Sequence, residues 1–96
     1  MLNDKQQRLY EAFTTSTHEG EHLDSKTEIL IGLAAAMAMD CAPCTNYYMK
    51  LARQQKVTKE EISEVLAKVM SVAAGQKRLQ MLDTMEKYKL DLSDYK

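Results

Sequence analysis

The stretch that most constrains the fold is residues 29–39, which carry no charged side chain. Their Ile, Leu, Met and Ala residues favour a helix, and a helix that is apolar on every face must be buried on all sides. A chain of 96 residues has too little surface to cover such a helix on all sides by itself. We therefore expect a central helix that is partly covered by a second copy of the chain. The stretch is shorter than the roughly 20 residues that a membrane span needs.

The remaining composition favours one all-α domain over residues 1–96. The chain holds only 3 Gly and 1 Pro, and the residues that dominate it are good helix formers. Its net charge is −1, and no block of Lys or Arg predicts nucleic-acid binding. The first residues lack the apolar core of a signal peptide. We therefore expect a cytoplasmic protein that binds neither nucleic acid nor membrane.

Helix start and stop signals predict five helices. Ser25–Glu28 and Thr58–Glu61 both match the S/T-x-x-E form of a capping box, Asp40 is a candidate N-cap for the third helix, and Gly75 is expected to end the fourth. The prediction is a compact five-helix bundle, assembled as a homo-oligomer, with a frayed or interface-forming tail. The expected helices cover residues 4–17, 25–39, 40–55, 58–75 and 76–89.

Cys41 and Cys44 form a C-x-x-C pair at the predicted start of the third helix. The unpaired N–H groups and the dipole of a helix N-terminus stabilise an anion, and the thiolate is the reactive form of cysteine. The three-residue offset lets the two sulfurs form a disulfide with little backbone movement, and Pro43 stiffens the turn. In a reducing cytosol, such a pair is more often catalytic or metal-binding than a structural cross-link. The pair is therefore the candidate redox centre.

Two other interpretations of the cysteines stay open. They can be small buried hydrophobic residues, or they can join His18 and His22, spaced i, i+4, as four zinc ligands. The order of the pairs is unlike that of a zinc finger, and the histidines fall near a predicted helix end. We expect both histidines to be exposed and without function, and no metal or organic cofactor to be bound.

Tyr48 and Glu28 are the other candidate site residues. Tyr48 follows Cys44 by four positions, so both share a helix face. Its hydroxyl can donate a hydrogen bond to a thiolate or peroxide oxygen, or the ring can simply pack in the core or an interface. Tyr47 should point elsewhere. Glu28 either closes the Ser25 capping box, which the residues alone favour, or relays a proton from an apolar setting.

The order of these motifs resembles the carboxymuconolactone decarboxylase family, in its alkylhydroperoxidase D-like branch. The resemblance covers residues 23–75: the segment around Glu28, the Ala-rich stretch, Cys41 and Cys44, and the Val57–Glu64 segment. It implies an all-helical dimer, trimer or hexamer that reduces hydroperoxides with a dithiol/disulfide cycle. It also implies Cys41 and Cys44 as the redox pair, with Cys44 favoured for attack, and Glu28 as the proton-relay carboxylate. A small hydroperoxide and an external dithiol or disulfide reductant protein would be the partners.

Two positions depart from the family's peroxidase pattern. Tyr48 stands where those members usually carry a histidine, and Pro43 stands where a histidine or an aromatic residue is usual. The sequence thus predicts no histidine near the motif, which argues against efficient peroxidase turnover. A disulfide reductase that serves a separate peroxidase, and a non-enzymatic zinc or scaffold protein, remain the alternatives. The chain has no recognisable site for flavin, nicotinamide or haem.

Overall fold

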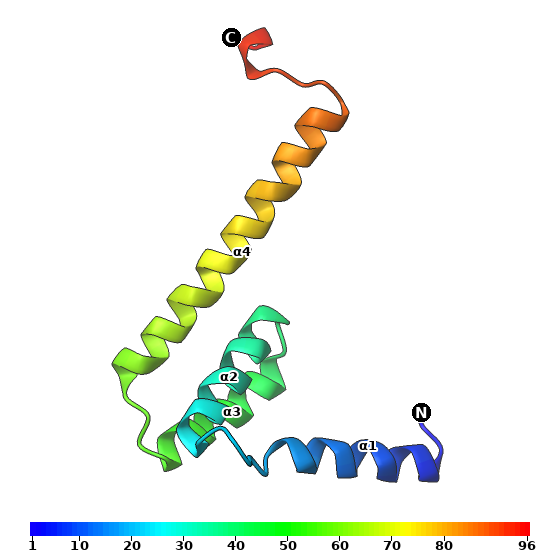
Figure 1. Cartoon of the computed structure of the whole chain (residues 1–96), viewed down its shortest axis with the longest axis vertical. Helices are drawn as coiled ribbons and strands as arrows, with labels where there is room; N and C mark the ends of the chain where they lie inside the picture. Colours follow the sequence, from blue (N-terminus) through cyan, green and yellow to red (C-terminus); the bar gives the residue numbers. More distant parts are fainter.

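The computed structural model describes all 96 residues, and its regular structure is entirely helical (Figure 1). The all-α prediction is therefore confirmed. No helix is both long enough and apolar enough to cross a membrane. The elements are α1 (Asp4–Thr17), α2 (Ser25–Ala38), α3 (Ala42–Gln54), α4 (Lys59–Lys87) and the short 3-10 helix η1 (Leu92–Asp94).

The prediction of five helices was wrong because the last two are one continuous helix. α4 runs through Gly75 without a break, and no glycine of the chain has a positive φ. A glycine inside a helix costs only about 1 kcal/mol relative to alanine. No proline follows Gly75, and the residues on both sides are mostly good helix formers. The helix therefore continues.

The start of α4 is the capping box that its sequence predicts. The Glu61 backbone N–H donates to Thr58 Oγ1 over 3.1 Å, and the Thr58 backbone N–H donates to Glu61 Oε1 over 2.9 Å. Lys26 Nζ lies 2.9 Å from Glu61 Oε2 and ties the first turn of α2 to that of α4. These contacts, the Thr58 backbone N–H first and Lys26 next, lower the pKa of Glu61 to about 2.

The capping box predicted at Ser25 does not form. Asp24 caps α2 instead, because its extended backbone lets Oδ1 accept the Thr27 backbone N–H over 2.7 Å. This backbone donor, with the Thr27 hydroxyl, lowers the pKa of Asp24. Ser25 becomes the first helical residue, and Glu28 is released from any capping role.

α2 is the centre of the fold and packs against both α3 and α4. Figure 1 shows α2 and α3 side by side, with the first half of α4 alongside them. The predicted packing of α2 against the cysteine helix is therefore confirmed. The buried core is small: Ile29, Leu33 and Ala36 of α2 and Ala52 of α3.

The single chain is extended, so the prediction of a compact bundle does not hold for one copy. Its radius of gyration is 19.1 Å, whereas a compact chain of this length has about 13 Å. α1 packs against no other helix along its length. The second half of α4 projects away from the α2–α3 pair (Figure 1). Large apolar side chains are exposed on both helices: Leu9, Tyr10 and Phe13 on α1, and Leu66, Met70, Val72, Leu79, Met81 and Leu82 on α4.

Candidate functional site

The two cysteines lie at the N-terminus of α3, as the C-x-x-C pattern predicts. Asp40, the expected N-cap, instead takes a left-handed backbone with φ of 54°, and the cap is Cys41. The two sulfurs are joined in a disulfide, with the Cα atoms 5.2 Å apart. The Cys44 backbone N–H donates to Cys41 Sγ over 3.3 Å. Cys41 is half-buried and Cys44 is exposed, so an incoming reactant meets Cys44 first.

Tyr48 lies one helical turn beyond Cys44, and a glycine makes room for its ring. A Cβ atom at Gly32 of α2 would overlap the Tyr48 ring directly. Only the missing side chain at Gly32 lets the aromatic ring of α3 lie flush on the backbone of α2. Gly32 therefore allows the cysteine helix to approach α2 closely. This contact positions Tyr48.

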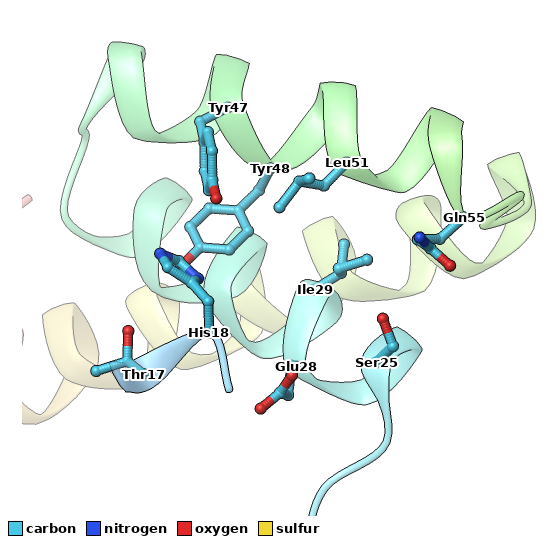
Figure 2. Close-up of a pocket in the computed structure, with 9 residues that line it drawn as sticks. All are labelled: Thr17, His18, Ser25, Glu28, Ile29, Tyr47, Tyr48, Leu51 and Gln55. Carbon is cyan, nitrogen blue, oxygen red and sulfur yellow. The ribbon is translucent and has the colours of Figure 1, made fainter. Parts of the chain in front are cut away.

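The end of α1 brings a histidine to the same place, contrary to the prediction. The ring centroid of His18 lies 5.5 Å from that of Tyr47 and 6.3 Å from that of Tyr48. The two tyrosine rings lie edge to face, 5.1 Å apart. Figure 2 shows both tyrosines extending from α3 toward His18. The expectation that Tyr47 points elsewhere was therefore wrong as well.

The three rings separate two hollows in the surface. The first, the cysteine hollow, is lined by Cys44 and Pro43 of α3 and by Thr14 and Thr15 of α1, together with the three rings. The second, the carboxylate hollow, measures about 200 Å³ and is lined by Glu28, Ile29 and Ser25 of α2, among others, together with the same rings. His18, Tyr47 and Tyr48 thus face both hollows.

Glu28 is half-buried in the carboxylate hollow. Figure 2 shows its carboxylate directed away from the two tyrosines. The turn between α1 and α2 closes over it, because a Cβ atom at Gly20 would overlap the carboxylate and would lie 2.8 Å from the Leu23 carbonyl oxygen. Glu28 and the cysteines share no hollow, so the ring cluster stands between them.

The four residues considered as zinc ligands do not assemble. The two cysteines are bonded to each other, and the His22 side chain is 93% exposed beside Glu21. No three His, Cys, Asp or Glu side chains lie together in a way that could hold a metal ion. Both histidines are exposed, as predicted, but only His18 lines the two hollows and lies against the tyrosine rings.

Sequence reasoning missed His18 and Tyr47 because their contacts span three segments that are distant along the chain. No spacing rule relates position 18 to positions 47 and 48. Gly20 gave no usable signal, because it marks a loop between two helices but does not say against which helix the preceding residues lie.

Comparison with known proteins gives one family match. The family model described as the carboxymuconolactone decarboxylase family matches residues 5–87, which include both cysteines, Glu28 and the ring cluster. No curated protein sequence matches the chain significantly. The disulfide pair at the start of α3 fits the alkylhydroperoxidase D-like branch of that family.

Proposed function

From the premise that this chain belongs to the carboxymuconolactone decarboxylase family, we propose that it is a thiol peroxidase that uses Cys41 and Cys44 as a dithiol/disulfide pair. The observation that carries the proposal is the position of the pair. Both cysteines lie at the N-terminus of α3, where backbone N–H groups favour a thiolate, and Cys44 lines an open hollow large enough for a small hydroperoxide.

The proposed cycle begins with the Cys44 thiolate, which attacks one peroxide oxygen. The O–O bond breaks, the electron pair leaves on the other oxygen, and a proton converts that oxygen to an alcohol. Cys44 becomes a sulfenic acid. The Cys41 thiolate then attacks the Cys44 sulfur, the S–S bond forms, and the departing hydroxide takes up a proton as water.

An external dithiol protein closes the cycle. Its thiolate attacks the exposed Cys44 sulfur, and Cys41 leaves as a thiolate. The Cys44 backbone N–H, which lies 3.3 Å from Cys41 Sγ, is placed to stabilise that leaving thiolate. A second thiol of the reductant then releases Cys44 as a thiol. The reductant leaves as a disulfide, having supplied the two electrons that reduced the peroxide to alcohol and water.

A second candidate function, disulfide reduction, rests on the exposure of Cys44 and on the weak proton exchange of a tyrosine at position 48. A disulfide reductase needs its reactive sulfur within reach of a partner protein, and Cys44 is exposed at an open hollow. Tyr48 is a poor proton donor or acceptor near neutrality, since the reference pKa of tyrosine is about 10. Such a protein would react slowly with peroxide and rapidly with the disulfide of a separate peroxidase.

Thiol counting on the reduced protein tests the proposal. A hydroperoxide should remove two free thiols per chain and produce one intramolecular disulfide. In Cys41→Ser, the remaining Cys44 should form a sulfenic acid that a dimedone probe traps, whereas Cys44→Ser should react far more slowly. Thiols that persist in excess hydroperoxide would overturn the peroxidase. Rapid reaction with a partner disulfide alone would establish the reductase.

The roles of Glu28 and Tyr48 are part of the same proposal. The family resemblance makes Glu28 the proton-relay carboxylate, and its release from the α2 cap leaves it free for this role. The Tyr48 hydroxyl would donate a hydrogen bond to the bound peroxide. Thiol reactivity measured against pH in the wild type and in Glu28→Gln separates a relay from a purely structural role, which should leave the profile unchanged.

We also infer that the protein works as a homo-oligomer. Its accessible surface is 8501 Å², and a compact monomer of the same mass exposes about 5,600 Å², so the excess is about 2,900 Å². In a dimer this excess amounts to about 5,800 Å² over both partners, at the upper end of the 2,000–5,000 Å² or more that obligate interfaces bury. A second copy that covers the exposed apolar side chains of α1 and α4 would account for this excess. Light scattering that finds one chain per particle would contradict it.

A further inference from the structure

The cysteine hollow contains one side chain that ordinarily exchanges a proton near neutral pH. The hollow is lined by Thr14, Thr15, His18, Pro43, Cys44, Tyr47 and Tyr48. Apart from the reacting thiol, only the imidazole of His18 is of a residue type that changes charge between about pH 5 and 8. The chain has 2 histidines, and His22 lines neither hollow.

We propose that His18 is the proton donor of the cysteine site, reaching it from α1 rather than from the cysteine helix. This inference rests on the proposed peroxide reduction. A hydroperoxide bound in the cysteine hollow would lie between Cys44 and His18, since both line it. When the Cys44 thiolate takes one oxygen, the protonated imidazole gives its proton to the departing alkoxide. Solvent then restores that proton.

The aromatic cluster holds the imidazole at this position. Tyr47 and Tyr48 flank His18, with ring centroids 5.5 Å and 6.3 Å from it, and Tyr48 is itself seated on Gly32. His18 is also the C-cap residue of α1, and its backbone N–H donates to the Thr15 carbonyl oxygen over 3.1 Å. The His18 side chain therefore lies against the tyrosine rings of α3, although α1 packs against no other helix along its length.

Glu28 lies in the other hollow that the rings line. It lines the carboxylate hollow, which His18 also lines. The other titratable groups that face His18 are Tyr47, Tyr48 and Cys44, all on α3, and α4 contributes no residue to either hollow. Glu28 and Cys44 share no hollow, so the group that donates a proton to the peroxide oxygen at Cys44 is His18 rather than Glu28.

The test compares His18→Gln with His22→Gln in the full chain. Glutamine retains hydrogen-bonding capacity but cannot exchange a proton near neutrality, and His22 is a matched control on the exposed side of the same turn. We expect His18→Gln to lower the rate of sulfenic acid formation about 100-fold and to abolish the pH dependence between about pH 5 and 8. His22→Gln should keep the wild-type rate and profile.

Two further measurements separate proton transfer from a structural role. Alkylation of the reduced thiols across the same pH range reports the titration of Cys44 itself, and this profile should be retained in His18→Gln. In His18→Ala, added imidazole should restore part of the peroxide rate, whereas a loss caused only by misplacement of α1 would not respond to it.

The possible outcomes distinguish this inference from the proposed function. If the wild type forms no sulfenic acid or disulfide with peroxide, the proposed peroxidase fails. If the wild type reacts and His18→Gln keeps both its rate and its pH dependence, only the role of His18 fails. A His18→Ala variant that is slow but that imidazole does not rescue also overturns proton donation.

Discussion

Alanine at Gly32 and alanine at Gly75 make a matched pair of substitutions, because both glycines lie inside α-helices but in opposite surroundings. A Cβ at Gly75 meets nothing within 4 Å, whereas a Cβ at Gly32 would overlap the Tyr48 ring. Replacing a glycine by alanine inside a helix gains about 1 kcal/mol from helix propensity. That gain should be common to both sites, so the difference between them isolates the contact with Tyr48.

The expected changes in the free energy of unfolding follow from helix propensity and from the contact with the Tyr48 ring. Gly75→Ala should raise the free energy of unfolding by about 1 kcal/mol. At Gly32 the same gain is opposed by overpacking, which costs about 1–3 kcal/mol. The ring is attached close to the α3 backbone and cannot simply swing its far end aside. Gly32→Ala should therefore be neutral to destabilising and fall about 1–3 kcal/mol below Gly75→Ala.

Urea unfolding followed by circular dichroism measures this difference. The protein concentration must be the same for all variants, because association contributes to apparent stability. A double-mutant cycle with Tyr48→Ala supplies the control, since it removes the ring that the new methyl group meets. In that background Gly32→Ala should become stabilising, as Gly75→Ala is.

The outcome that would refute the reasoning is equal stabilisation by Gly32→Ala and Gly75→Ala in the presence of Tyr48. The ring would then not lie on the α2 backbone. The position of the aromatic cluster beside Cys44 would lose its structural basis.

Three further predictions concern the α4 cap, the assembly and the Tyr48 hydroxyl. The pKa of Glu61 is lowered from 4.5 to about 2, chiefly by the Thr58 backbone N–H. The ionised Glu61 carboxylate therefore stabilises the fold fully above about pH 4.5, and this stabilisation is lost as the pH falls toward 2. The Tm advantage of the wild type over Glu61→Gln should shrink over that interval, and a constant difference would contradict the capping role of Glu61. Leu79→Glu, at an exposed apolar position of α4, should shift the particle mass toward the 11.0 kDa chain in light scattering, whereas the charge-changing control Lys77→Glu should not. Tyr48→Phe keeps the ring on the α2 backbone and should change the free energy of unfolding by less than about 1 kcal/mol, because even a hydrogen-bonded hydroxyl contributes only about that much. The same variant should lower the peroxide rate, and an unchanged rate would exclude the hydroxyl from the reaction.

Local chemistry made several features predictable from the sequence. The Thr58–Glu61 capping box depends on contacts three residues apart, as does the disulfide between Cys41 and Cys44. Two predictions of the same kind were wrong. Asp24 displaced the Ser25 cap because two adjacent residues can both accept a hydrogen bond at a helix start. Gly75 did not end a helix, because the cost of one glycine is small beside the helix preference of its neighbours.

What the sequence by itself determined is the all-helical class, the cysteine pair at a helix start and the excess of apolar side chains for a chain of this size. Only the tertiary structure decided which side chains stand beside the cysteines. His18, Tyr47 and Tyr48 meet because the end of α1 lies against α3 and because Gly32 lets α3 lie close on α2. Such contacts join segments about thirty residues apart, and they depend on the space between helices, which no periodicity along the chain encodes.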